Sequence, residues 1–194
     1  EIGSLMQGQV GTPNVLKIKR MGIEQPFEKT VTRRNLNVVN IPYYGMIDSN
    51  VAYISLLSFT KDAALKTSKA FLELKQKNPK GLIFDLRGNG GGLIGEAVDI
   101  LNLFVEKDVE VVQTKSRLRD KNYKYMTRKE PVDKEIPIVI LVDRNSASAA
   151  EIVSGAAQDL DRAVIIGERT YGKGLVQNVV PVSFNSQLKV TIAK

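Results

Sequence analysis

"GLIFDLRGNGGGLIGEAVDILNLF", residues 81–104, changes its hydrophobic pattern at a group of glycines. Residues 81–86 are a short apolar run of the kind that forms a buried strand. After the glycines, apolar residues recur at the spacing of one helix face. These residues are Ile94, Ala97, Val98, Leu101 and Phe104. The segment therefore predicts a buried strand that turns through glycine into the start of an amphipathic helix.

The same strand-to-helix pattern occurs on both sides of this segment. Residues 51–59 predict a strand, and a helical repeat of apolar residues follows, up to a stop at the Asn-Pro-Lys-Gly sequence 78–81. Further along, residues 136–142 predict a strand, 149–160 a helix and 163–168 a returning strand. Strands that alternate with helices predict a layered α/β core, whose functional groups gather where strands lead into helix starts.

The N-terminal part of the chain has a different character. Residues 15–20 and 29–39 predict two strands joined by a connection that contains Gly and Pro. Two strands are too few for a domain, whereas all 194 residues suffice for one packed domain and part of a second. With 43% hydrophobic and 25% charged residues the composition is globular, and no stretch of about 18 apolar residues predicts a membrane span. The first residues also lack the pattern of a signal peptide.

The net charge is +7, and the densest basic segment is "KSRLRDKNYKYMTRK", residues 115–129. Its basic residues and two tyrosines fit a nucleic-acid-binding patch. The simpler interpretation, which we favour, is a solvated, mobile loop. Nucleic acid is therefore not an expected partner.

The chain contains neither Cys nor His, which excludes several classes of active site. Without Cys there are no disulfides, thiolate nucleophiles or thiolate metal sites. Without His there is no imidazole base, which excludes a Ser-His-Asp triad and the common zinc sites.

The glycine-rich turn before the helix at residue 94 has two interpretations. A dinucleotide-binding fingerprint that begins at Gly88 would require glycine at position 93, where Leu93 stands. One remaining interpretation is a flexible turn whose backbone N–H groups, at the positive end of a helix, bind an anion or an oxyanion. The other is a tight turn that needs glycine for steric reasons alone.

The helix start at residue 149 is a second candidate site. Ser148 followed by Glu151 fits a capping box, which needs no catalysis to explain it. The same position would expose a nucleophilic hydroxyl beside helix-end N–H groups, including that of Ala149. Asp159 cannot serve as its base, since 11 residues along one helix place it about 16 Å away.

Lys173 is the other candidate for the base. It lies between Gly172 and Gly174 in a segment that could fold back toward the helix start. A lysine accepts a proton only when neutral, so its pKa must fall from about 10.4 to roughly 7–8. The spacing Gly167 to Lys173 also resembles a phosphate-binding loop, but position 174 is not Ser or Thr and the following residues predict a strand instead of a helix.

Three blocks carry a resemblance to a known family. "DLRGNGGG", "VDRNSASAAEIVSGAAQD" and "GERTYGKGLVQ" resemble, in order, the signature blocks of the carboxyl-terminal processing proteases, also called tail-specific proteases. The middle block has SASAAE where many relatives have SASASE. The resemblance implies a serine endopeptidase with a Ser-Lys dyad on a crotonase-like ββα core, without a metal or cofactor. It assigns five roles: nucleophile Ser148, general base Lys173, lysine-orienting Gln177, and oxyanion-hole N–H groups of Gly92 and Ala149.

The resemblance also implies a domain organisation. Residues 1–34 resemble the end of a PDZ domain, and residues 35–194 the protease domain, which in relatives continues past an ending such as "VTIAK". The implied partners are protein or peptide substrates bound through their C-terminal region, with an oligomer left open. The implied location is outside the cytoplasm, in the periplasm or cell envelope.

Two other function classes are open. A crotonase-like acyl-CoA enzyme would share the core fold and the oxyanion-hole chemistry. An inactive scaffold would use Ser148 only as a helix cap and residues 115–129 to bind a partner.

Overall fold

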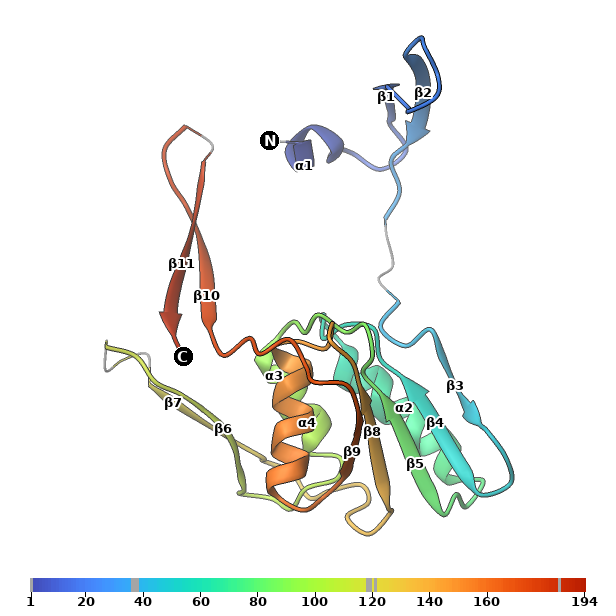
Figure 1. Ribbon diagram of the computed structural model, residues 1–194, viewed down its shortest axis with the longest axis vertical. Helices are drawn as coiled ribbons and strands as arrows, with labels where there is room; N and C mark the ends of the chain where they lie inside the picture. Colours follow the sequence, from blue (N-terminus) through green and yellow to red (C-terminus); the bar gives the residue numbers. More distant parts are fainter. Residues whose placement is uncertain (1, 36–38, 118–119, 121, 185) are drawn as a thin grey trace. The chain divides into compact units, whose positions relative to one another are not determined.

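The computed structural model describes residues 2–35, 39–117, 120, 122–184 and 186–194 (Figure 1). The chain divides into two compact units. The larger unit contains residues 39–180 and 188–194, and the smaller unit combines the described parts of residues 1–38 and 181–187.

The larger unit is built on a five-stranded sheet with the strand order β3-β4-β5-β8-β9. β3 (Tyr43–Met46) is antiparallel to β4 (Val51–Ser55). β4 then pairs in parallel with β5 (Gly81–Asp85), β5 with β8 (Ile138–Val142), and β8 with β9 (Val164–Gly167). The carboxyl ends of β5 and β8 therefore lie at the same edge of the sheet, where the turns that follow them meet.

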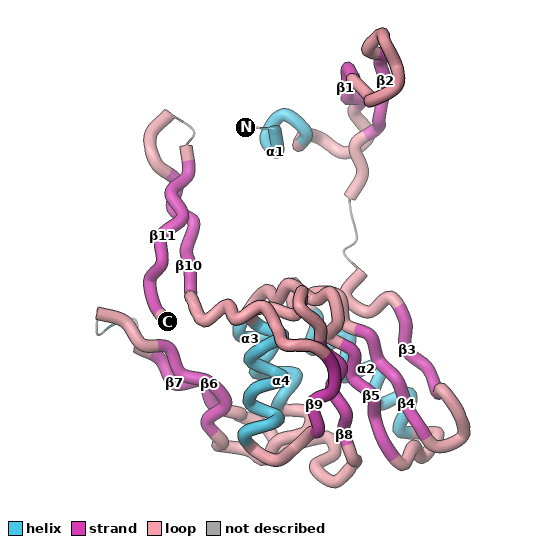
Figure 2. The backbone as a smooth tube through the Cα atoms, in the orientation of Figure 1, coloured by secondary structure: helices cyan, strands magenta, loops and turns pink. Residues whose placement is uncertain are grey.

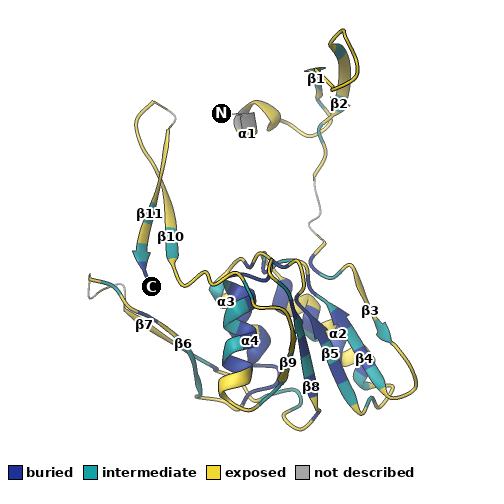
Figure 3. Cartoon of the chain, viewed as in Figure 1, coloured by how far each residue is buried: buried dark blue, intermediate teal, exposed yellow. Residues whose placement is uncertain are grey.

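Three helices cover one face of this sheet: α2 (Ala63–Lys75), α3 (Ile94–Leu101) and α4 (Ala149–Asp159) (Figure 2). Side chains along β4, and along β5 as far as Phe84, alternate between half-buried and buried, as expected when one face is covered. The buried set joins sheet and helices in one core (Figure 3). Its members include Ile54, Phe84, Ile140, Phe71, Leu101 and Val153. The alternating strand-helix pattern and the α/β fold class are confirmed.

A hairpin projects from the same unit. β6 (Glu110–Thr114) and β7 (Tyr123–Met126) pair antiparallel, and the Lys124 amine binds the Glu110 carboxylate at 2.7 Å. The prediction of a solvated loop over 115–129 is therefore wrong at residues 123–126, because cross-strand pairing organises this polar sequence. Residues 118, 119 and 121 of that run lie outside the described residues.

The remaining elements are short and local. The smaller unit holds α1 (Ile2–Met6) and the antiparallel pair β1 (Pro13–Ile18) and β2 (Phe27–Thr32). The second predicted strand ends at Thr32 and does not continue through Arg33 to Asn35, while residues 36–38 are outside the described part. β10 (Val176–Pro181) pairs with β11 (Gln187–Ala193). Among the described residues, no helix is long and apolar enough to cross a membrane.

Candidate active site

The buried side-chain amide of Asn89 holds the glycine-rich turn after β5 in place. Asn89 is fully buried; its Nδ2 donates to the Leu56 carbonyl at 2.8 Å, and its Oδ1 accepts from the Gly91 N–H at 2.8 Å. Phe59 then holds the turn on both sides of residue 92: its N–H donates to the Gly91 carbonyl at 3.0 Å, and its carbonyl accepts from Leu93 N–H at 2.8 Å. The backbone around Gly92 is consequently held in one orientation.

This pairing determines where the Gly92 N–H points. No peptide bond among the described residues is cis, so the Gly91 carbonyl and the Gly92 N–H of one peptide unit point in opposite directions. The carbonyl faces Phe59, and the N–H therefore faces away from it. Gly92 has a φ of 149°, and a Cβ there would lie 2.4 Å from the Phe59 carbonyl oxygen. The steric need for glycine is thus confirmed, and none of the described residues accepts a hydrogen bond from the Gly92 N–H.

The turn after β8 is locked to the glycine-rich turn. Asp143 Oδ1 accepts hydrogen bonds from the N–H groups of Gly88 and Asn145, each at 2.9 Å. The bond from Gly88 is the main cause that holds the pKa of Asp143 below its usual range. In addition, the Ala147 N–H donates to the Asn89 carbonyl at 2.9 Å. The two helix starts are therefore connected by direct hydrogen bonds.

Ser146 and Ser148, both in this turn, have different surroundings. The Ser146 hydroxyl is buried; it donates to the Leu86 carbonyl at 2.8 Å and accepts from the Asp143 N–H at 2.9 Å. Ser148 is half-buried and lines a pocket. Of the two hydroxyls, only that of Ser148 faces a space that could hold a substrate.

Ser148 has a strained backbone. Its φ of 56° and ψ of −114° place it in a region that residues other than glycine rarely adopt, whereas ordinary N-cap residues are extended. Ser148 and Glu151 form a capping box, in which Glu151 Oε2 accepts from the Ser148 N–H at 2.7 Å. The capping prediction is confirmed, but capping alone does not require a positive φ. A strained serine in a strand-to-helix turn is also the geometry of a nucleophile elbow.

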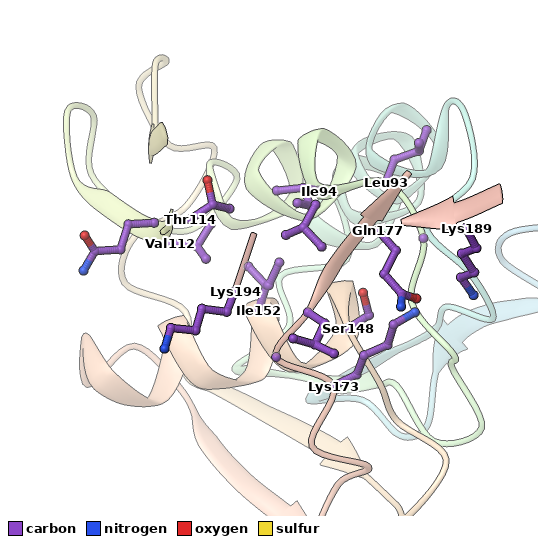
Figure 4. Close-up of a pocket in the computed structure, with 15 residues that line it drawn as sticks. Leu93, Ile94, Val112, Thr114, Ser148, Ile152, Lys173, Gln177, Lys189 and Lys194 are labelled. Atoms are coloured by element: carbon purple, nitrogen blue, oxygen red, sulfur yellow. The ribbon is translucent and has the colours of Figure 1, made fainter. Parts of the chain in front are cut away.

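Ser148 shares its pocket with Lys173 and Gln177. The pocket has a volume of about 490 Å³, and Figure 4 shows the side chains of Lys173 and Gln177 extending toward each other within it. Its apolar walls come from several elements. They are formed by Leu93, Ile94, Val112, Ile152, Leu175 and Val176. The charged side chains along it are those of Lys173, Lys189 and Lys194, and no Asp or Glu is among the lining residues.

The predicted catalytic side chains are close in space but not bonded to each other. Within the described part of the chain, no hydrogen bond joins the Ser148 hydroxyl to the Lys173 amine. Gln177 Nε2 donates to Thr191 Oγ1 of β11 at 3.3 Å, which leaves the amide oxygen for another donor. The strand predicted after Lys173 does not begin directly after the lysine, since β10 begins at Val176. The prediction that a strand and not a helix follows Lys173 is confirmed, and a phosphate-binding loop is thereby excluded.

The backbone of Ala149 lies against the glycine-rich turn. A Cβ built on Gly91 would lie 2.9 Å from the Ala149 nitrogen and 2.8 Å from the Ser148 Cβ. Ala149 is fully buried, and none of the described residues accepts a hydrogen bond from its N–H. The N–H groups of Gly92 and Ala149 thus belong to two turns in contact beside Ser148.

Sequence reasoning missed the second role of Glu151. Its Oε1 accepts from the Thr170 hydroxyl at 2.8 Å and the Gly172 N–H at 2.6 Å, and its Oε2 also accepts from the Lys173 N–H at 2.9 Å. The spacing of Ser148 and Glu151 indicated a cap, but nothing in the sequence shows that residues 170–173 fold back onto this carboxylate. Across the described ranges, no cluster of three or more acidic side chains is arranged to hold a metal ion.

Comparisons with known proteins match this architecture. A carboxy-terminal-processing protease of Bartonella bacilliformis is 34% identical over 192 residues, a match that covers 97% of this chain and 44% of that protein. The carboxy-terminal processing protease CtpA of Bacillus subtilis is 34% identical over 194 residues, covering 100% of this chain and 41% of that protein. The chain therefore spans less than half the length of these curated relatives.

Solved structures agree with the fold. The photosystem II D1 C-terminal processing protease superimposes with a TM-score of 0.71 at 27% identity, covering 100% of this chain and 53% of that one. A putative S41 protease from Bacteroides fragilis gives a TM-score of 0.70 at 17% identity, covering 95% and 55%, and so supports the fold alone. The family model of peptidase family S41 matches residues 50–194, which include both turns and the pocket. The chain belongs to peptidase family S41, together with the carboxyl-terminal processing proteases.

Proposed function

We propose that this chain carries the catalytic centre of a serine endopeptidase that cleaves protein substrates near their C-termini, with Ser148 as nucleophile and Lys173 as general base. The observation that carries the proposal is the strained φ of 56° at Ser148, at a helix start that shares one pocket with Lys173. In a chain without histidine or cysteine, a lysine is the base that this pocket offers.

The proposed reaction has two stages. Neutral Lys173 accepts the hydroxyl proton while Ser148 Oγ attacks the peptide carbonyl carbon, and the C=O electron pair moves to oxygen. The tetrahedral intermediate collapses, the C–N bond breaks, and the protonated lysine gives its proton to the leaving amine. Water then attacks the acyl-enzyme by the same route, which releases the new carboxyl terminus and restores the Ser148 hydroxyl.

Backbone donors would stabilise the oxyanion in both stages. The N–H of Gly92 points away from Phe59, and that of Ala149 has no acceptor among the described residues. Such donors are already oriented before the charge develops, and each is typically worth about 3–4 kcal/mol of the barrier. Gln177 would accept a hydrogen bond from the lysine amine and direct it toward Ser148.

The pocket suits an apolar substrate residue followed by negative charge. Ile94, Val112 and Ile152 give it aliphatic walls, and Lys189 and Lys194 are among its lining residues. A peptide that ends in a carboxylate close to the cleaved bond would complement both features. The same proposal includes the selection of substrates by their C-terminal regions and a location outside the cytoplasm. It also assigns residues 1–34 to a PDZ remnant and residues 35–194 to the protease domain.

A fluorophosphonate probe tests the proposal directly. We expect covalent labelling of the peptide that contains Ser148, and none in Ser148→Ala. Ser154→Ala is the matched control, because this serine lies on the same helix and its hydroxyl donates, within the described part of the chain, to the carbonyls of Ala150 and Glu151 of that helix. Labelling that persists in Ser148→Ala would assign the nucleophile elsewhere. A folded chain that is never labelled would favour the inactive scaffold or the acyl-CoA class.

A further inference from the structure

The Glu151 carboxylate bridges the segment that bears the proposed nucleophile and the segment that bears the proposed base. Its Oε2 accepts from the backbone N–H groups of both Ser148, at 2.7 Å, and Lys173, at 2.9 Å. Its Oε1 accepts from the Thr170 hydroxyl and the Gly172 N–H. We propose that Glu151 is a positioning residue, which holds the Lys173 segment against Ser148 in the arrangement that proton transfer requires. This inference rests on the function proposed above.

Helix capping explains only one of these four hydrogen bonds. A capping box requires that the third helical residue accept from the N-cap N–H, which is the bond to Ser148. The other three donors belong to residues 170–173, which are distant in sequence and not part of α4. A glutamate that served only the helix would have its second oxygen in water.

The Lys173 segment has few other attachments. Among the described residues between Arg169 and Leu175, two backbone hydrogen bonds supplement those to Glu151. They run from the Tyr171 N–H to the Ser146 carbonyl, at 3.0 Å, and from the Gly174 N–H to the Gly172 carbonyl, at 3.2 Å. The second is internal to the segment. Apart from the bond of Tyr171, the segment is therefore hydrogen-bonded to the start of α4 through Glu151 alone.

The segment itself would not hold the lysine in place. Gly172 has a φ of 84°, and a Cβ at Gly172 or Gly174 would meet nothing within 4 Å. Backbone of this kind gains the most conformational freedom when its tethers are removed. Displacement of a catalytic group by about 1 Å can cost on the order of a hundredfold in rate, so a tether at the backbone of Lys173 affects catalysis without touching substrate.

The chemistry of the site favours a carboxylate specifically. All four groups are used as donors, and an ionised carboxylate is an acceptor only, with lone pairs for two donors on each oxygen. Burial raises the pKa of Glu151, but the hydrogen bonds from Thr170, Lys173, Gly172 and Ser148 outweigh this effect and lower it. A glutamine of the same shape would direct its NH₂ group at one or two backbone N–H donors. Glu151→Gln therefore breaks the tether and preserves the volume of the side chain.

The test compares matched variants by amide hydrogen exchange and by the rate of fluorophosphonate labelling. In Glu151→Gln we expect exchange at Gly172 and Lys173 to accelerate by about tenfold or more, since charge-assisted bonds are lost. We expect Ser148 labelling to slow by about 10- to 100-fold. Thr170→Val should slow labelling by a smaller factor, and Thr170→Ser, which keeps the hydroxyl, should restore it.

Glu96→Gln is the control for a merely structural loss. Like Glu151, Glu96 is an acidic residue of a helical first turn that accepts two backbone N–H groups of another segment, those of Asp62 and Ala64, at 3.0 and 2.7 Å. Those bonds hold the start of α2 and not the lysine segment. We expect Glu96→Gln to lower the midpoint of urea unfolding about as much as Glu151→Gln, with wild-type labelling.

Each outcome decides something different. Unchanged exchange at Gly172 and Lys173 in Glu151→Gln overturns the tether. Faster exchange with wild-type labelling, or equal slowing in Glu96→Gln, overturns its role in positioning. If wild-type protein is not labelled at Ser148, the proposed function fails and the positioning role with it, while the exchange data still establish whether the tether exists.

Discussion

The N–H of Phe59 donates a hydrogen bond to the carbonyl of Gly91 at 3.0 Å, and this bond sets the direction of the peptide unit that precedes the proposed oxyanion site. Because the peptide is trans, the Gly92 N–H points away from Phe59. A residue of the strand-to-helix connection before α2 thus orients a donor in the connection before α3.

Gly92→Ala should abolish this orientation. A Cβ at Gly92 would lie 2.4 Å from the Phe59 carbonyl oxygen, so the peptide must rotate or the turn must move. Loss of one oxyanion donor costs about 10²–10³ in kcat, and we expect a loss of that size in peptide hydrolysis with a smaller change in KM. Gly90→Ala is the control, since a Cβ at Gly90 meets nothing within 4 Å. Equal activity of the two variants would rule out an oriented Gly92 donor.

The rate of peptide hydrolysis should depend on whether the side chain at position 173 can lose a proton. General bases contribute about 10²–10⁴-fold, so we expect Lys173→Ala to lower kcat by that amount with KM nearly unchanged. Lys173→Arg should not rescue activity, because a guanidinium stays protonated and cannot accept the hydroxyl proton. Lys69→Ala, on the exposed side of α2, should behave as wild type. An active Lys173→Arg enzyme would show that the amine supplies only positive charge.

Thr191 should act through Gln177. Its hydroxyl holds Gln177 Nε2 at 3.3 Å, which would leave the amide oxygen directed at the lysine amine. Thr191→Val should lower kcat several-fold, and Thr191→Ser should retain activity. A double-mutant cycle gives the decisive measurement: in a Gln177→Ala background, Thr191→Val should have no further effect. Additive losses would mean that the two side chains act independently.

The strand and helix units around the pocket could be predicted because each has its own local signal. The apolar run at 81–86 and the helical repeat after it need no tertiary information, and the Ser148–Glu151 spacing likewise specified the cap. β3 and β7 were missed, since each has four residues with mixed polarity and gains its stability from a partner strand.

Other features of the site depend on how the chain folds back on itself. Lys173 and Gln177 face one pocket although the backbone between them is not a regular strand before Val176. The bonds from residues 170–173 to Glu151 and the positive φ of Ser148 arise from tertiary contacts, which no residue spacing encodes. The sequence predicts candidate residues for the reaction, and the structure shows which contacts hold the segments that carry them.

Acid should weaken the connection between the turns that follow β5 and β8, because ionised Asp143 accepts the Gly88 N–H. The hydrogen bond from the Gly88 N–H, above all, lowers the pKa of Asp143 in the folded protein. A lowered pKa means that Asp143 binds a proton less readily in the folded state than in the unfolded state, where the pKa of aspartate is about 3.9. The ionised Asp143 therefore stabilises the fold above that pH, and this contribution is lost as the pH falls through the lower, folded-state pKa.

Asp143→Asn isolates this contribution. We expect the variant to have a lower urea midpoint than wild type at pH 7, and a smaller difference from wild type at pH 3. The acid sensitivity that remains would come from other groups with a lowered pKa, such as Asp85 and Asp133. Asp99→Asn, exposed on α3, is the control and should leave the midpoint near wild type at both values. A difference between Asp143→Asn and wild type that stays constant from pH 7 to pH 3 would show that ionised Asp143 does not hold the two turns together.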